Sequence, residues 1–390
     1  FPEPSVDLEI GWILLGLPLA FAAGWLASRL DLRQLRIENR QAPKAYFRGL
    51  NYLLNEQQDK AIDAFIEAVQ RDPDTSELHF ALGNLFRRRG EYDRAVRVHE
   101  HLLSRADLSE TDRHRAQHAL ALDFLKAGLL DRAEDALRKL EGTAHAEPAR
   151  LALLAIYERS REWSHASAVA QSLQAEGPAR FDNRLAHYLC EEAQAHQQGG
   201  DEGAAIDCLR RAIDTAPQVA RPRLQLAALQ RDAGRAHEAW STLRALAENC
   251  PQALALAAPL VRAVGLAVGE EADARRLLEQ ANKDSPSIDL VEALVQLDLQ
   301  IGRPPAQAQQ RYLDHLERQP SLIAAARWLA GQQGSPQAVA APVCRAVEHA
   351  SRPLSRYRCA ACGFEAREHF WQCPGCQAWD SYPPRRLEEL

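Results

Sequence analysis

The chain has 390 residues and a formal net charge of −6, with 47 basic against 53 acidic side chains. This length allows one large domain or two to three smaller ones, and the mild charge excludes nucleic-acid binding driven by overall basicity. Aromatic residues make up 6% of the chain. Alanine, leucine, arginine, glutamate and glutamine dominate, which favours helices over sheets.

Residues 10–28 form the first predicted element, a run of nineteen residues without a charged side chain, IGWILLGLPLAFAAGWLAS. A helix of this length crosses a hydrocarbon core of ~30 Å at about 1.5 Å per residue. We therefore expect a membrane anchor in residues 1–28. A cleaved signal peptide is the alternative, but its usual basic start is replaced here by acidic residues. A buried core helix fits less well, because the apolar character goes all round.

The flanking charges predict how the anchor is oriented. Acidic residues precede it, whereas basic residues follow it in a predicted juxtamembrane helix, residues 29–44: Arg29, Arg33, Arg36, Arg40 and Lys44. Because positive residues stay cytoplasmic, we expect a single-pass membrane protein. Its amino terminus would lie outside and the bulk of the chain in the cytoplasm.

Residues 45–330 repeat with a period of about 34 residues. One small residue recurs at steps of 34, 38, 33, 39, 34, 35 and 34: Ala61, Ala95, Ala133, Ala166, Ala205, Ala239, Ala274 and Ala308. A proline follows five of these alanines after twelve residues: Pro73, Pro217, Pro251, Pro286 and Pro320. The pattern predicts tetratricopeptide repeats, which stack pairs of helices into a right-handed superhelix. We expect the extra residues of the two longest steps in turns between repeats.

The residue types in the first repeat have a physical reason. Small residues at Gly49 and Ala61 allow two helices to cross closely, while Tyr52 and Phe65 fill the space beside them. Pro73 cannot continue the second helix, so it ends that helix.

The repeat region contains no nucleophile–base pair, phosphate-binding loop or H-E-x-x-H motif, so we expect a binding scaffold and no enzyme. Asn84 and Arg88 are four residues apart on one helix face, and Arg87 lies beside them. These three residues are candidates for binding an acidic or backbone-rich partner segment, although a solvated basic face is the alternative. His99 is expected to be packed or solvated and not to be a metal ligand.

Four cysteines near the end of the chain form two C-x-x-C pairs: Cys359, Cys362, Cys373 and Cys376. Two such turns can close a tetrahedral four-sulfur site, which leaves no open coordination position and is therefore structural. Gly363 and Pro374–Gly375 are expected to supply the sharp backbone of the turns. Zn(II) is the preferred ion and iron is the alternative. A redox or disulfide set is disfavoured in a cytoplasmic protein.

Residues 356–390 are the predicted metal-binding module, and residues 331–355 the joint before it. The module has five arginines and five acidic residues, so it should bind nucleic-acid phosphates poorly. We expect it to contact protein instead, either the array or a partner. Metal binding should drive its folding. Five aromatic side chains are expected to cap the metal: Tyr357, Phe364, Phe370, Trp371 and Trp379. The remaining cysteines should be buried free thiols: Cys190, Cys208, Cys250 and Cys344.

Anchor, helical repeats and terminal ribbon, in this order, resemble the lipopolysaccharide assembly protein B family. The most specific stretches are NYLLNEQQDKAID, LGNLFRRRGEYDRAVRVH, AGLLDRAED, YRCAACGF and WQCPGCQAW. The family's metal-binding cysteines carry over onto Cys359, Cys362, Cys373 and Cys376. The sequence departs from the family in its longer acidic amino terminus and in the weak repeats after Ala239.

The resemblance implies an all-α fold: a tetratricopeptide-repeat superhelix with an N-terminal transmembrane helix and a small C-terminal rubredoxin-like zinc ribbon. It also implies an inner-membrane regulator of lipopolysaccharide synthesis. Such a regulator presents the deacetylase that commits precursor to lipid A to the membrane protease FtsH, and answers to a lipopolysaccharide-sensing membrane protein. The alternatives are a scaffold for envelope biosynthetic enzymes without a proteolytic role, and an iron-loaded redox protein.

Overall fold

The computed structural model describes residues 20–22, 24–25, 44–177, 180–331 and 345–390. These residues fall into two compact units, residues 1–160 and residues 161–390. The predicted anchor and juxtamembrane helix lie almost entirely outside the described residues, as does most of the predicted joint. Residues 20–22 and 24–25 are helical, and so are residues 345–351.

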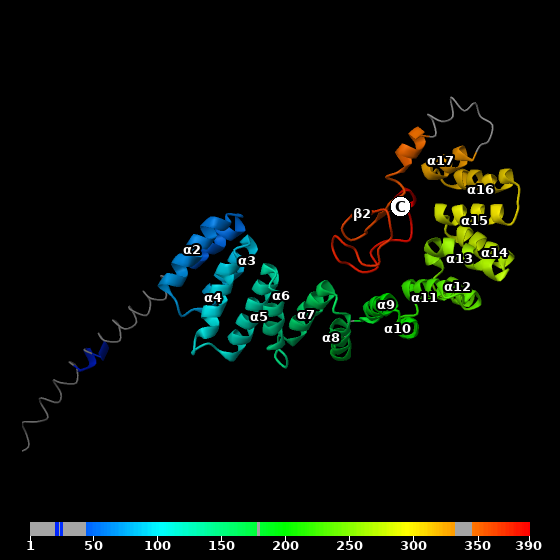
Figure 1. Ribbon diagram of the computed structural model, residues 1–390. Helices are drawn as coiled ribbons and strands as arrows, with labels where there is room; N and C mark the ends of the chain where they lie inside the picture. The colour runs from blue at the N-terminus through cyan, green and yellow to red at the C-terminus, as the bar shows by residue number, and fades with distance from the viewer. Residues whose placement is uncertain (1–19, 23, 26–43, 178–179, 332–344) are drawn as a thin grey trace, which may run out of the picture. The chain divides into compact units, whose positions relative to one another are not determined.

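The first unit consists of successive antiparallel helices, each packed against the next along the chain (Figure 1). It opens with helical residues 44–54. The helices that follow are α2 (Gln58–Arg71), α3 (Ser76–Arg89), α4 (Tyr92–Ser104), α5 (Glu110–Ala127), α6 (Leu130–Arg138) and α7 (Ala146–Ser160).

The second unit continues the same pattern and ends in a small ribbon. Its helices are α8 (Trp163–Glu176), α9 (Asp182–Gln198), α10 (Glu202–Thr215), α11 (Ala220–Asp232), α12 (Ala236–Asn249), η1 (Pro251–Ala253), α13 (Leu254–Val268), α14 (Glu271–Asp284), α15 (Ile288–Gln300), α16 (Pro305–Arg318) and α17 (Leu322–Ala330). The ribbon contains two strands and a final helical turn: β1 (Tyr357–Arg358), β2 (Glu365–Ala366) and η2 (Leu387–Glu389).

The recurring alanine marks the same place in every repeat. It is the fourth residue of each second helix, from Ala61 in α2 to Ala308 in α16. All eight alanines are at most 1% exposed. At this helix crossing a larger side chain has no room, which is why the register survives even in the last repeats. The predicted tetratricopeptide architecture is confirmed.

Prolines end the second helices as predicted. Each of the five lies two residues beyond the last helical residue, as Pro73 does after α2 and Pro320 after α16. Proline lacks the backbone N–H that a helix needs, and it disfavours helical geometry in the residue before it.

The placement of the extra residues in the long repeats was predicted wrongly. They do not lie mainly in the turns. Instead, α5 has 18 residues and α9 has 17, whereas α3 in a regular repeat has 14. The additional length is nearly a full helical turn, which keeps the apolar face in register while the helix extends.

Close packing at the helix crossings explains why two repeats have a glycine at the same position. A methyl group added at Gly49 would lie 2.8 Å from the ring of Phe65, and one added at Gly83 would lie 2.5 Å from the ring of His99. Both contacts are shorter than carbon atoms tolerate, so only glycine allows the facing ring to pack there.

Among the described residues, one helical stretch is long and apolar enough to cross a membrane, Pro251–Val268. It belongs to η1 and α13, and several of its side chains are buried in the main core of the second unit: Leu254, Ala257, Ala258, Val261 and Val264. This stretch is therefore a core helix of the array.

Candidate metal centre

A short hairpin carries the first cysteine pair. Strands β1 and β2 pair antiparallel, and Cys359 and Cys362 lie in the turn between them. The N–H of Cys359 donates to the carbonyl of Phe364 over 2.9 Å, and the N–H of Gly363 donates to the carbonyl of Cys359 over 2.9 Å. Gly363 has a φ of 77°, a left-handed conformation that glycine adopts without strain. The prediction for this turn is confirmed.

The second cysteine pair lies in a turn with the same hydrogen bonds. The N–H of Cys373 donates to Ala378 over 2.9 Å, and the N–H of Gln377 donates to Cys373 over 2.8 Å. Here the left-handed residue is Gln377, with a φ of 61°, and not Gly375. The expectation that Gly375 supplies the sharp bend is therefore wrong. Gly375 instead packs against the ring of Phe364, which would lie 3.4 Å from an added methyl group.

The two turns bring all four predicted ligands together. Their Sγ atoms lie within 4.8 Å of one another. The Sγ atoms of Cys359 and Cys376 are 3.8 Å apart, and those of Cys362 and Cys373 are 3.7 Å apart. A tetrahedral ion with metal–sulfur bonds of about 2.3 Å has sulfur–sulfur edges of about 3.8 Å. The four sulfurs fit a single structural metal ion, and these edge lengths suit zinc and iron alike.

The thiols differ in acidity when no ion screens them. Burial raises the pKa of Cys359, but hydrogen bonds with the Ser381 hydroxyl and with the N–H groups of Cys362 and Ala361 outweigh burial and lower it. For Cys362, the N–H of Phe364 lowers the pKa, whereas burial and the neighbouring thiols raise it, and the net shift is upward. Four sulfur atoms this close cannot all carry negative charge alone, so a bound cation is what allows four thiolates.

The aromatic side chains of the ribbon are arranged differently from the predicted metal cap. Phe364 and Phe370 are 44% and 36% exposed. Trp371 packs against the main core of the array, and Trp379 packs against α9. Tyr357 lies as predicted, because it packs with Cys359, Cys373 and Tyr382 in the small core of the ribbon. The hydroxyl of Tyr382 donates to the carbonyl of Phe364 over 3.2 Å, which ties the segment after the second turn to the first turn.

One edge of the ribbon lies on α9. The ring of Trp379 stacks on His187, with centroids 4.7 Å apart and planes 19° apart. The carboxylate of Asp380 lies 2.8 Å from Nε2 of the same buried histidine. Tyr188 and Trp163 contact Trp379 edge-on, with ring centroids 6.0 and 6.2 Å away. These contacts place an aromatic anchor of the ribbon among rings of the array.

The segment after the ribbon attaches to α15. The guanidinium of Arg386 makes two hydrogen bonds of 3.0 Å to the carboxylate of Asp289 and lies 4.3 Å from the centroid of the Tyr357 ring. Burial disfavours the charge of Arg386, but Asp289 outweighs burial and raises the pKa of the guanidinium. A paired carboxylate and an aromatic face thus hold a half-buried arginine between ribbon and array.

Two acidic residues then cap two helices of the array. Glu389 accepts a hydrogen bond of 2.6 Å from the N–H of Ile288, the first residue of α15. Glu388 accepts bonds of 2.8 Å from the Ser321 hydroxyl and 3.3 Å from the N–H of Ile323, and a further one from the N–H of Leu322. Carboxylates at helix amino termini satisfy free N–H groups and complement the helix dipole. The expected protein contact of the module is thus with the array.

Sequence patterns do not identify these attachment residues. His187 and Asp380 are 193 positions apart. The Arg-Arg-Leu-Glu-Glu run near the end of the chain is the one visible signal, because basic and acidic side chains adjoin there without an apolar pattern.

The predicted partner-binding residues lie on α3 in the first unit. Nη1 of Arg87 donates to the buried carboxylate of Asp123 over 2.8 Å, and Nη2 donates to the side-chain oxygen of Asn84 over 2.5 Å. Nδ1 of His99 lies 2.5 Å from the other oxygen of Asp123, so His99 is packed as expected. Asn84 and Arg87 thus belong to an internal network, while Arg88 is exposed. Partner binding by these residues stays a prediction.

Three of the four scattered cysteines are placed, and they are buried free thiols as expected: Cys190, Cys208 and Cys250. Burial raises the pKa of the Cys190 thiol to about 12. Such a thiol stays protonated and is a poor nucleophile. Cys344 lies outside the described residues.

Comparisons with known proteins agree with this architecture. The profile of a family described as "Rubredoxin metal binding domain" matches residues 357–384, and a tetratricopeptide repeat profile matches residues 186–219. Lipopolysaccharide assembly protein B of Escherichia coli (strain K12) is 30% identical, over 97% of this chain and 98% of that protein. The protein of that name from Haemophilus influenzae is 29% identical over the same shares.

The chain is also similar to solved structures of repeat proteins. A tetratricopeptide repeat protein from Parabacteroides merdae covers 66% of this chain and 98% of its own, with a TM-score of 0.34 and 15% identity. The sequence relationship to lipopolysaccharide assembly protein B extends over 97% of this chain. With its repeats and its four-cysteine ribbon, this chain belongs to the family of lipopolysaccharide assembly protein B.

Proposed function

We propose that this chain is a non-enzymatic adaptor at the bacterial inner membrane that regulates lipopolysaccharide synthesis. The observation that carries this proposal is the relationship to proteins named lipopolysaccharide assembly protein B over 97% of the chain. The structure supports it in two ways. A helical repeat array offers an extended surface for binding other proteins. A four-sulfur site leaves no open coordination position at which a metal ion could act on a substrate. In this proposal residues 1–28 anchor the chain, and the array lies in the cytoplasm.

The adaptor acts by bringing proteins together. Its client is the deacetylase that commits precursor to lipid A, its effector is the FtsH protease in the same membrane, and a lipopolysaccharide-sensing membrane protein controls the adaptor. Tethering raises the local concentration of a client to about the millimolar range when linkers are short. The client is then degraded faster, although the adaptor itself catalyses nothing.

In this proposal the ribbon has a structural role and no catalytic one. A metal ion bound by Cys359, Cys362, Cys373 and Cys376 neutralises the thiolates and joins the two turns. The chain's own residues then do the positioning: Trp379 and Arg386 hold the ribbon on the array. We propose zinc as the ion.

Client lifetime tests the adaptor function. The chain is depleted in its own bacterium, and the deacetylase half-life is measured by pulse–chase with the protease active and with it inactivated. We expect depletion to lengthen the half-life only while the protease is active. An unchanged half-life would instead support a scaffold for envelope enzymes without a proteolytic role.

Metal analysis of the purified protein tests the ion. We expect about one zinc per chain and no colour. A stoichiometric iron content with a reversible couple would instead support the redox alternative.

A further inference from the structure

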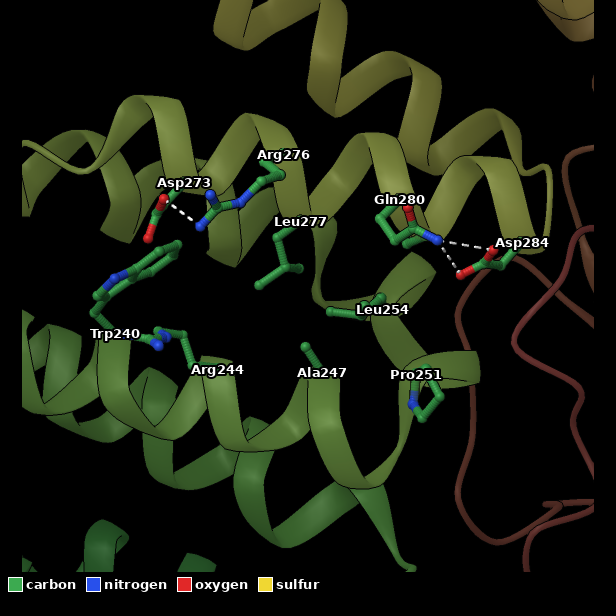
Figure 2. Close-up of a pocket in the computed structure, with 11 residues that line it drawn as sticks. Trp240, Arg244, Ala247, Pro251, Leu254, Asp273, Arg276, Leu277, Gln280 and Asp284 are labelled. Carbon is green, nitrogen blue, oxygen red and sulfur yellow. Dashed lines mark hydrogen bonds and ion pairs between the residues drawn. The ribbon is translucent and has the colours of Figure 1, made fainter.

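A groove between the second helices of two neighbouring repeats is lined by residues of the array alone. It runs between α12 and α14 and has a volume of about 390 Å³ (Figure 2). Trp240, Leu254 and Leu277 form its apolar floor. Trp240 and Leu254 are only 6% and 3% exposed and belong to the main core of the second unit. The floor is therefore held rigidly by the fold.

A small side chain explains why the groove is open. Ala247 lies on its α12 wall, eight residues after the recurring alanine Ala239. At this position four of the seven other repeats carry large apolar residues that pack against their own cores: Val69, Leu103, Ile213 and Leu316. Alanine at this position leaves unfilled the volume that those side chains occupy. A second hollow, between α8 and α10, has a volume of about 300 Å³ and is lined more by polar side chains: Ser164, Ser167, Gln171, Glu192, Arg211 and Thr215.

The two ends of the groove differ in charge (Figure 2). At the Trp240 end, Arg276 pairs with Asp273 over 2.6 Å, and the exposed Arg244 has no ion pair within the described part of the chain. Two guanidinium groups therefore face one carboxylate. At the other end, the carboxylate of Asp284 accepts bonds of 2.9 and 3.0 Å from Gln280, a neutral donor. Among the side chains that line the groove, one excess positive charge therefore lies at one end and one excess negative charge at the other.

We infer that this groove docks a short peptide segment of the proposed client, an inference that rests on the proposed function. The segment carries a large apolar side chain for the floor, an acidic residue beside it for Arg244, and a basic residue for Asp284. The wall from Asp273 to Asp284 rises about 17 Å, which about five extended residues span. A lipid chain with an anionic head would leave Asp284 without a cation, so the charges favour a peptide. Tryptophan and arginine are the side chains that most often anchor such contacts.

Binding to the purified client tests the inference. The full-length chain in detergent micelles is titrated with the purified deacetylase as wild type, Ala247→Leu, which fills the hollow, and Arg244→Glu, which reverses the free charge. Arg210→Glu is the matched control, because Arg210 is exposed and occupies the same repeat position in α10. We expect at least tenfold weaker binding for both groove variants and less than a twofold change for the control. Thermal unfolding of each variant verifies that the array is intact.

The results distinguish failure of the groove assignment from failure of the proposed adaptor function. If the wild type binds the client and both groove variants bind it equally well, the groove assignment is overturned while the adaptor function stands. If the wild type does not bind the client and depletion leaves the client's half-life unchanged, both are overturned. A photo-reactive amino acid at position 247 should cross-link to a client segment with adjoining apolar and acidic residues. Cross-linking to a second copy of this chain, or to lipid, would overturn the inference.

Discussion

A buried carboxylate in the first unit joins three helices through single side chains. Asp123 of α5 is fully buried, and it contacts Arg87 of α3 and His99 of α4. A buried ion pair adds little net stability, but removing one partner leaves the others without compensation. The network therefore fixes how these helices align more than it strengthens them.

Replacing this carboxylate tests that interpretation. We expect Asp123→Asn to lower the free energy of unfolding by about 3 kcal/mol, because Arg87 keeps its charge with no counterion. Urea unfolding followed by circular dichroism measures the loss. Asp63→Asn, at an exposed position of α2, is the control and should change stability little. Equal effects of the two substitutions would contradict the assigned role.

Glycine at the second helix crossing gives a steric prediction. Gly83→Ala would place a methyl group 2.5 Å from the ring of His99. We expect a loss of about 1–3 kcal/mol, typical of overpacked cores. Gly203→Ala is the control, because an added methyl group there meets nothing closer than 3.7 Å. Thermal unfolding should separate the two variants, and a neutral Gly83→Ala would show that the helices can shift apart freely.

A buried histidine predicts how stability depends on pH. Burial lowers the pKa of His315, with Glu388 opposing and Arg318 adding to the shift. Because the unfolded chain then binds protons more readily, this contribution to stability is complete above about pH 6.5 and is lost as the pH falls through the lowered pKa. Urea unfolding at pH 7.5, 6.5 and 5.5 should show a decline that His315→Gln makes shallower, with the remainder due to His79, His118 and His369, whose pKa values burial also lowers. His237→Gln, on the exposed face of α12, should leave the decline unaltered.

Among the structural elements, the segment that follows the ribbon has an unusual role. Its carboxylates cap α15 and α17, so these array helices depend on residues outside the repeats. We expect the double variant Glu388→Gln, Glu389→Gln to weaken each cap by about 1 kcal/mol. Hydrogen exchange should then accelerate at the amides of Ile288 and Ile323. The exposed Glu368→Gln serves as the control, and unchanged exchange in the double variant would refute the capping role.

The ribbon itself should fold only around its ion. We expect Cys359→Ser and Cys376→Ser to lose the metal, unfold the ribbon and abolish regulation, because three ligands leave the turns poorly joined. Metal content per chain and tryptophan fluorescence measure this, since Trp371 and Trp379 would leave the array. Cys208→Ala, in α10, should retain the metal. A serine variant with full metal content and normal deacetylase levels would contradict the prediction.

The elements that sequence could predict are those with local causes. An alanine at a tight crossing, a proline after a helix and two C-x-x-C pairs act within about 35 residues, so their spacing is visible in the chain. This is why Ala61 through Ala308 and Pro73 were placed correctly, and why the four cysteines could be expected to lie together.

The remaining features depend on contacts that no local pattern encodes. Trp379 was assigned to the metal cap, but its ring stacks on His187, far away in the sequence. Gln377 adopts a left-handed conformation that residue type would assign to glycine. The charged pair of Arg386 and Asp289 forms only because the ribbon folds back onto α15.

For the whole molecule, the predicted anchor should matter for location and not for folding. We expect deletion of residues 1–28 to leave a soluble array with intact ribbon and impaired regulation, since the client would no longer be held at the membrane. Fractionation, circular dichroism and client half-life measure these three properties. Full regulation by the truncated chain would show that co-localisation is unnecessary.

The ribbon's attachments also bear on how the second unit deforms. A solenoid whose repeats contact only their neighbours can bend along its length, because no contact joins distant repeats. Here one small module contacts four helices. Its residues Trp379, Arg386 and Glu388 contact α9, α15 and α17, and Leu256 of α13 packs against its core. Bending would have to break several of these bonds at once, so residues 161–390 should be stiff. A partner then meets a surface whose shape is already set, and little conformational entropy is lost when the two associate.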